Sequence, residues 1–146
     1  MFNPELSLAA LNAFSADTLV STLGIEFTEI GPDFLAARMP VDGRTVQPFR
    51  QLHGGASVSL AESLGSVASF ALIDPATHAA VGLEINANHL RGVRSGYVHA
   101  TASPLHIGRR THVWDIRIVD DDGRLVCVCR LTMAIVEREG EVKSNQ

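Results

Sequence analysis

The 146-residue chain lacks the features that mark nucleic-acid-binding, secreted or membrane-spanning proteins. Lys143 is its only lysine and its net charge is −4, whereas nucleic-acid-binding domains usually carry a basic surplus. No apolar run approaches the roughly 18 residues that a membrane-spanning helix needs. The first residues, Met1-Phe-Asn-Pro-Glu5, show neither the basic nor the apolar segment of a signal peptide. We therefore expect a cytoplasmic protein that binds neither nucleic acid nor membrane.

Motifs for metal, nucleotide and serine chemistry are also missing. Cys127 and Cys129 are two positions apart in a β-like segment, so both point to one face and are expected to be reduced packing residues. The histidines show no metal-ligand spacing, and neither a P-loop nor a G-x-G-x-x-G occurs. The segment around Ser57 lacks the second glycine of a nucleophile elbow. We expect no metal and no cofactor.

What is present indicates one α+β domain over residues 1–146. Hydrophobic residues make up 46% of the chain and charged residues 19%, which suits a globular core. Helical spacing covers residues 6–20, with Ser15 a candidate cap before a short second turn. Strands are expected at 25–30 and 34–39, then a loop at 41–52, a long helix at 54–72, and strands at 80–90, 96–103, 105–119 and 124–137. Residues 120–123 form a hairpin turn, and 139–146 are expected to fray.

The long helix carries a single carboxylate, Glu62, among small and apolar residues. At 100° per residue Ser59, Glu62, Ser66 and Ser69 share one face, which forms a narrow polar stripe. A charge in an apolar helix is costly unless it is paired or used. Glu62 is therefore a candidate catalytic group. The alternative is that an arginine neutralises it or that it reaches solvent.

The helix begins at His53-Gly54-Gly55, where free backbone N–H groups can hold a developing negative charge. Two glycines can also mark only a tight entry into a helix. Gly54 and Glu62 are eight residues apart, or about 12 Å along the axis, whereas reacting groups must approach within about 3–3.5 Å. If both serve one reaction, one of them comes from a second subunit, which implies at least a dimer.

Four arginines form two further candidate clusters: Arg91 with Arg94, and Arg109 with Arg110. Each could be an ordinary solvated surface residue. As two clusters flanking neighbouring strands, they could instead hold the phosphates of an extended ligand.

Two blocks, residues 47–69 and the segment Val81-Gly-Leu-Glu-Ile-Asn-Ala-Asn-His89, resemble the hotdog-fold acyl-CoA thioesterases. The likeness runs from about Leu8 to Ile135. It is strongest to the branch of glutamate-dependent 4-hydroxybenzoyl-CoA thioesterases and 1,4-dihydroxy-2-naphthoyl-CoA hydrolases. The resemblance implies one central helix wrapped by a curved antiparallel sheet.

The resemblance also implies roles for particular residues. Glu62 matches the catalytic carboxylate, as nucleophile or general base, and Gly54 matches the backbone N–H that polarises the thioester carbonyl. Gln47 and His53 match residues beside the thioester, and Ser66 a hydroxyl residue of the acyl pocket. The remaining expected substrate-binding residues are Gly55, Ser63, Gly82, His89, Leu90, Arg91, Gly92, His106, Ile107, Gly108, Arg109, Arg110 and Thr111.

In the family each site is assembled between two subunits, usually within a tetramer of paired dimers. Coenzyme A is then part of the substrate and not a cofactor. Gly92 and the run of residues 109–111 depart from the family pattern. These departures affect contacts to the coenzyme A phosphates and not the hydrolytic chemistry. The acyl group can be aromatic or medium-chain aliphatic. The pathway can be menaquinone biosynthesis or aromatic metabolism. A hotdog hydratase or dehydratase and a non-catalytic acyl-CoA-binding module are the alternatives.

Overall fold

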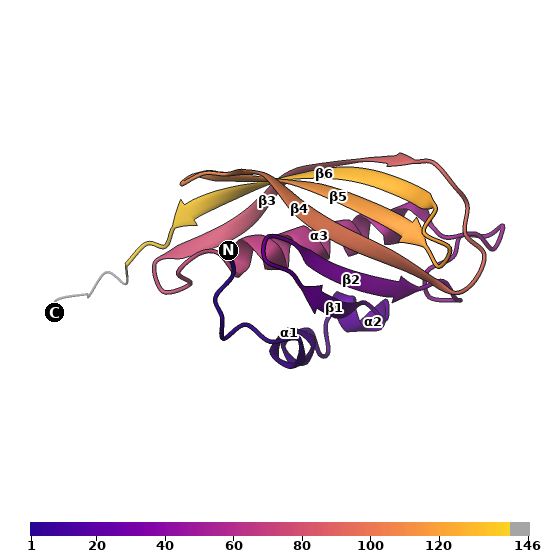
Figure 1. The fold of residues 1–146 in the computed structure, drawn as a ribbon, viewed down its shortest axis with the longest axis horizontal. Coiled ribbons are helices and arrows are strands. Elements are labelled where there is room, and N and C mark those ends of the chain that lie inside the picture. The colour runs from indigo at the N-terminus through magenta and orange to yellow at the C-terminus, as the bar shows by residue number, and fades with distance from the viewer. Residues whose placement is uncertain (141–146) are drawn as a thin grey trace, which may run out of the picture.

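The fold is one antiparallel sheet of six strands curved around a long helix (Figure 1). The computed structural model describes residues 1–140. The strands lie in the order β1-β2-β4-β5-β6-β3. The elements are α1 (Leu8–Phe14), α2 (Leu19–Thr22), β1 (Glu26–Ile30), β2 (Leu35–Pro40), α3 (Gly54–Phe70), β3 (His78–His89), β4 (Tyr97–Ile107), β5 (Thr111–Asp120) and β6 (Leu125–Glu137).

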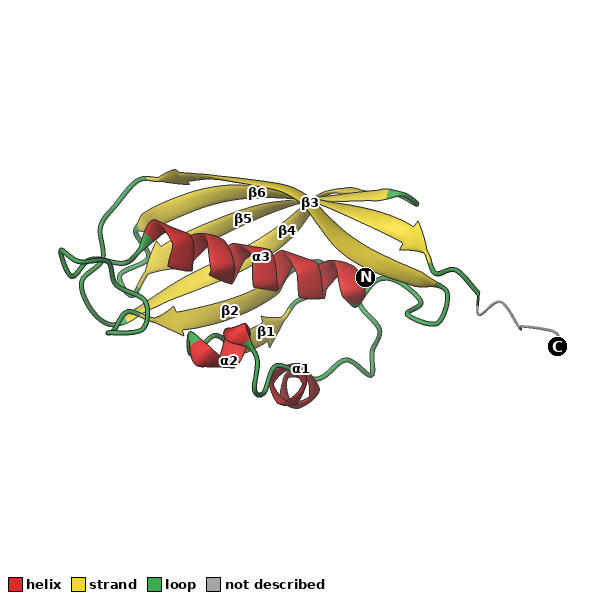
Figure 2. Cartoon of the chain, turned by 180° about the vertical axis from the view of Figure 1, so that it is seen from behind, coloured by secondary structure: helices red, strands yellow, loops and turns green. Residues whose placement is uncertain are grey.

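The central helix α3 lies across one face of the sheet, while α1 lies beside β1 and α2 contacts α3 (Figure 2). Small and branched side chains alternate along α3, so its buried surface includes Ala61, Leu64 and Ala68, all fully enclosed. Such a helix, apolar on most of its circumference, needs protein around it. The strands supply it by alternation: in β5 the side chains of Trp114, Ile116 and others at even positions face the core.

The strand β3 forms one edge of the sheet. Twelve residues long, it pairs antiparallel with β6, and within residues 1–140 no strand pairs with its other side. Val81 and Leu83 of β3 are 49% and 64% exposed. A long edge with exposed apolar side chains is a template for pairing with another chain.

The structure confirms the α+β architecture and corrects two local predictions. The expected break between strands near Pro104 is wrong: β4 runs on to Ile107 and the turn falls at residues 108–110. Pairing of β2 with β4 ends at Ala102, and a bulge follows Pro104, so the proline sits where one edge is open. Ser15 does not start the second helix. It is the C-cap of α1, and the Thr18 hydroxyl caps α2.

Other boundaries differ from the prediction by a few residues. The long helix ends at Phe70 and not at residue 72. The hairpin turn at 120–123 is confirmed, since Gly123 has φ +77° and Asp120 accepts the backbone N–H groups of Asp122 and Arg124. Residues 138–140 have no regular structure, and the rest of the predicted fraying tail lies outside the described residues. No helix within residues 1–140 combines the length and apolarity that crossing a bilayer requires.

Candidate active site

The N-terminus of α3 presents an unused backbone donor. His53 is the N-cap, and its Nδ1 accepts the N–H of Gly55 at 2.8 Å. The N–H of Gly54 makes no hydrogen bond within residues 1–140. A free N–H at the positive end of a helix of 17 residues is suited to stabilising an oxyanion.

Gln47 is held beside this helix end by a closed loop. Val46 bridges to Leu52, and the Gln47 N–H donates to the carbonyl of Gln51 at 2.8 Å. The Gln47 side-chain oxygen accepts the Phe49 N–H. The amide nitrogen of Gln47 is therefore the end left to donate to another group.

A cavity of about 400 Å³ adjoins the helix end. Its lining brings together predicted residues that are distant in sequence, namely Gln47, Gly54 and the segment 89–92. Gln51, Leu52, Ser57 and Val126 also line it and were not predicted. Gln51 and Leu52 lie in the same predicted loop as Gln47, which is the sequence signal that could have found them.

His89 packs directly on the start of α3. A Cβ at position 54 would lie 3.0 Å from the His89 Nε2, so glycine allows this close approach. The Nδ1 of the same ring lies 3.6 Å from the Cys127 sulfur. Cys127 and Cys129 are both buried and unbridged, as expected for packing residues of one strand face.

Glu62 lies elsewhere on α3, against Gly82 of β3. A Cβ at position 82 would come within 2.5 Å of the Glu62 Oε1, so the glycine makes room for the carboxylate. Within residues 1–140 no arginine forms an ion pair with Glu62. The alternative that an arginine neutralises this carboxylate is therefore not what the structure shows. Burial raises the pKa of the Glu62 carboxyl above its ordinary value of 4.5.

Ser66 and Ser63 accompany Glu62 on α3. Ser66 lies one turn beyond Glu62, and its hydroxyl is 3.7 Å from the Met133 sulfur. Both serines are half-buried. The polar stripe predicted from spacing does not extend to Ser69, which is fully buried at the far end of the helix.

Ser69 belongs instead to a buried network. Its hydroxyl oxygen accepts the Trp114 indole N–H at 2.8 Å and lies 3.1 Å from the His112 Nδ1. Burial lowers the pKa of His112 below its ordinary value of 6.5, against a hydrogen bond to the Gly108 backbone that raises it. A neutral His112 ring that donates its N–H to the Gly108 backbone has Nδ1 left to accept a hydrogen bond from the Ser69 hydroxyl. This network ties the β4–β5 turn to α3 and is structural.

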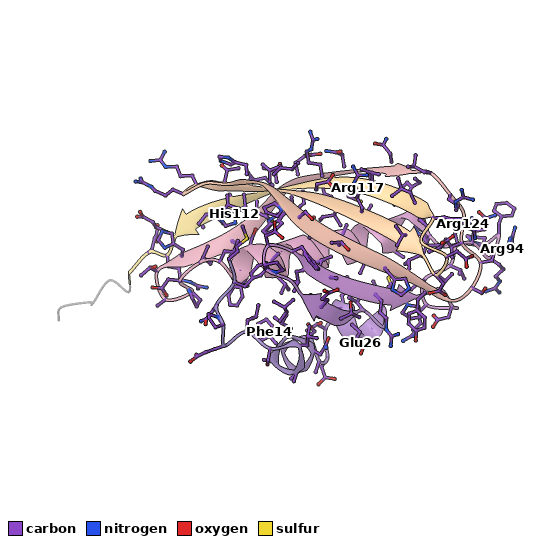
Figure 3. The ribbon with its side chains drawn as sticks, in the orientation of Figure 1. Phe14, Glu26, Arg94, His112, Arg117 and Arg124 are labelled. Carbon is purple, nitrogen blue, oxygen red and sulfur yellow. The ribbon has the colours of Figure 1, made fainter. Side chains whose placement is uncertain are left out.

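The predicted residues lie at three separate places on one chain. Glu62 rests on Gly82, whereas Gly54 rests on His89, seven residues further along β3. The segment 106–111 is at the opposite end from residues 89–92: Arg110 accepts from the Ile135 N–H, while Leu90 donates to Val126. Figure 3 shows Arg94 at one end of the molecule and His112 in the opposite half. The two arginine clusters, which we expected to flank neighbouring strands, therefore lie at opposite ends of β4 in one chain.

Comparison with known proteins decides the family. The sequence profile of the thioesterase superfamily matches residues 50–127. The chain belongs to the thioesterase superfamily. Its six-stranded sheet and central helix are the hotdog fold of these enzymes, and it is a thioester hydrolase.

Three relatives illustrate the similarity. The 1,4-dihydroxy-2-naphthoyl-CoA hydrolase of Escherichia coli is 54% identical over 132 residues, which is 90% of this chain and 96% of the relative. The proofreading thioesterase EntH of Cronobacter turicensis is 50% identical over 132 residues, with the same two coverages. The crystal structure of a mutant of thioesterase PA1618 from Pseudomonas aeruginosa has a TM-score of 0.92 and 52% identity. The match covers 94% of this chain and 99% of the PA1618 chain.

Proposed function

We propose that this thioesterase hydrolyses acyl-CoA thioesters to the free acid and coenzyme A, with Glu62 as the catalytic carboxylate. The observation that carries this proposal is a carboxylate without a neutralising arginine in the described chain, set on a glycine that leaves room for it. The similarity to a relative named as an acyl-CoA hydrolase supports the choice of substrate.

The chemistry follows from two groups. The thioester carbonyl accepts a hydrogen bond from the Gly54 N–H, which stabilises the oxyanion as the carbonyl carbon becomes tetrahedral. The Glu62 carboxylate either attacks the carbonyl carbon itself, which forms a mixed anhydride, or takes a proton from a water molecule that attacks the carbon. The C–S bond then breaks, and coenzyme A leaves as a thiolate that takes up a proton. Water supplies an oxygen of the acid product, either as the attacking group or by hydrolysing the mixed anhydride, which regenerates the Glu62 carboxylate. The amide nitrogen of Gln47 donates a second hydrogen bond to the thioester.

The site is completed between two copies of the chain. Gly54 and Glu62 of one chain rest on different parts of β3. The free edge of β3 carries exposed apolar residues and offers backbone groups for antiparallel pairing with β3 of a second copy. Such pairing brings Glu62 of one subunit towards Gly54 of the other, and an even number of sites results. A dimer, or a tetramer of two such dimers, satisfies this requirement.

A thiol-release assay tests the proposed function. The purified protein is incubated with acetyl-, octanoyl-, benzoyl- and naphthoyl-CoA, and free thiol is measured. Parallel incubation with crotonyl-CoA follows the enoyl absorbance, which a hydratase would remove without releasing thiol. Thiol release supports hydrolysis, which also removes the enoyl thioester band because the thioester itself is lost. Loss of enoyl absorbance without thiol indicates a hydratase, and no change across the panel indicates a binding module.

The acid limb of the pH profile is a further prediction. Glu62 must be ionised to attack or to take a proton, and its pKa is raised by burial. Activity is therefore lost as pH falls through a pKa above the ordinary value of 4.5. We expect kcat/KM, which reports the free enzyme, to show this limb. A midpoint at or below the ordinary glutamate value would contradict the assignment of Glu62.

A further inference from the structure

The loop 47–52 carries a second glutamine, Gln51, into the cavity of about 400 Å³ beside the start of α3. Gln47 and Gly54 of this cavity have roles in the proposed hydrolysis, whereas Gln51 has none. The Gln51 side chain is half-buried, and within residues 1–140 its amide makes no hydrogen bond. The amide can therefore both donate to a bound ligand and accept from it.

The position of Gln51 is fixed by the backbone of the loop. Its carbonyl accepts the Gln47 N–H at 2.8 Å, and the next residue, Leu52, donates its N–H to the Val93 carbonyl at 2.7 Å. Arg50 closes the loop with φ +64°, in the left-handed region that residues with a side chain rarely adopt. A loop held in this way presents the Gln51 side chain next to Gln47.

Gly92 supplies the space beside the Gln51 amide. A Cβ at position 92 would lie 2.5 Å from the Gln51 Oε1, 3.0 Å from its Cδ and 3.5 Å from its Nε2, so the amide group lies against the glycine. The backbone of Gly92 does not have the positive φ that favours glycine. The missing side chain at position 92 therefore matters for the placement of Gln51 and not for the local backbone.

The rest of the cavity wall indicates which part of an acyl-CoA passes Gln51. Ser57, His89 and Arg91 add a hydroxyl, an imidazole and a guanidinium to the two glutamine amides. An apolar acyl group would cover these polar groups without replacing their hydrogen bonds to water, which is unfavourable. The thiol side of the substrate is polar, because the pantetheine arm carries two amides and leads to phosphates. This arm therefore matches the chemistry of the cavity.

We propose that the Gln51 side chain binds the pantetheine arm by a hydrogen bond to one of its amides, and that Gly92 keeps room for this contact. The inference rests on the proposed hydrolysis of acyl-CoA. Only two carbons separate the sulfur from the nearer amide, so a thioester held at Gln47 and Gly54 places that amide close to Gln51. The contact is the same in the bound substrate and in the transition state. It therefore lowers KM and leaves kcat unchanged.

Matched thioesters test which part of the substrate Gln51 contacts. The benzoyl thioesters of coenzyme A, pantetheine and 2-mercaptoethanol share the reacting group, but the last has no amide. Gln51→Leu keeps most of the side-chain volume and removes the amide. We expect it to raise KM for benzoyl-CoA and benzoyl-pantetheine about three- to tenfold, the scale of one neutral hydrogen bond. The wild-type kcat should be kept, and kcat/KM for the mercaptoethanol thioester should not change.

Gly92→Ala is the second arm of the test. The added Cβ meets the far end of the flexible Gln51 side chain, which can move aside, so the variant should fold and yet lose the contact. We expect KM for benzoyl-CoA to rise as far as in Gln51→Ala. Once that side chain is gone, adding Gly92→Ala should cause no further rise, because both changes act on one contact.

Three results would overturn the role of Gln51. They are a wild-type KM for benzoyl-CoA in Gln51→Leu, an equal loss with the mercaptoethanol thioester, and a rise from Gly92→Ala that is the same with or without Gln51. The Kd of the inert thioether S-octyl-CoA, which should rise about three- to tenfold in Gln51→Leu, tests the contact without turnover. Absence of thiol release by the wild-type protein from every acyl-CoA would instead refute the proposed hydrolysis.

Discussion

Replacing Glu62 with glutamine is expected to lower thioester turnover by about 10³-fold or more, the scale of general-base and nucleophilic contributions. Glutamine keeps the size of the side chain against Gly82 but cannot carry the negative charge. Glu62→Ala should fall at least as far. Turnover is measured as thiol release under saturating substrate, so that the comparison reports kcat.

Ligand affinity is the control for this variant. The carboxylate acts on the reacting carbon, so the Kd of an inert thioether such as S-octyl-CoA should stay close to the wild-type value in Glu62→Gln. An intact circular-dichroism melt excludes misfolding as the cause. Near-normal turnover in either variant would remove Glu62 from the mechanism.

Removing the backbone donor at Gly54 is the second prediction with a large effect. Gly54→Pro deletes the N–H at the first position of α3, a position where proline is well tolerated. The preceding residue, His53, already has φ −69° and ψ 130°, values that a residue before proline prefers. We expect kcat to fall by roughly 10²–10³-fold, as for loss of one oxyanion donor.

The matched control is Gly54→Ala, which adds a Cβ but keeps the N–H. That Cβ would lie 3.0 Å from the His89 ring, which is exposed and can shift slightly. The alanine variant should therefore keep most of its turnover. If the proline and alanine variants lose activity equally, crowding against His89 is the cause and the Gly54 N–H is not an oxyanion donor.

The fold could be predicted from the sequence to the level of its elements, because its signals are local. The apolar run with one carboxylate predicts α3, and the Asp-Asp-Asp-Gly turn predicts the last hairpin. The predicted strand break near Pro104 was wrong because a strand can contain proline wherever no neighbouring strand needs a backbone N–H at that position. Here this depends on where β2 stops pairing with β4, which is decided by tertiary structure and not by the local sequence.

The candidate site could likewise be predicted only in part from the sequence. The spacing of Gly54 and Glu62 already requires two subunits if both serve one reaction. The sequence could not show that Ser69 leaves the polar stripe, because its partners Trp114 and His112 lie on β5. Nor could it show that Glu62 rests on Gly82, since that contact joins distant segments. Helical spacing predicts a face, but only packing decides what that face meets.

In the proposed oligomer each site takes Gly54 from one subunit and Glu62 from another, and mixed oligomers test this directly. Glu62→Gln and Gly54→Pro chains should each be inactive when assembled alone. When equal amounts are unfolded together and reassembled at random, half of the subunit pairs are hybrids. Each hybrid pair contains one site with both native groups and one site with neither.

Thiol release by the mixture should recover to about a quarter of the wild-type rate, since half of the pairs carry one working site of two. Each variant reassembled alone, and the two mixed without unfolding, are the controls and should stay at the residual rate. A mixture that remains at the residual rate of its parents, while wild-type protein reassembled in the same way regains its activity, would contradict the shared site.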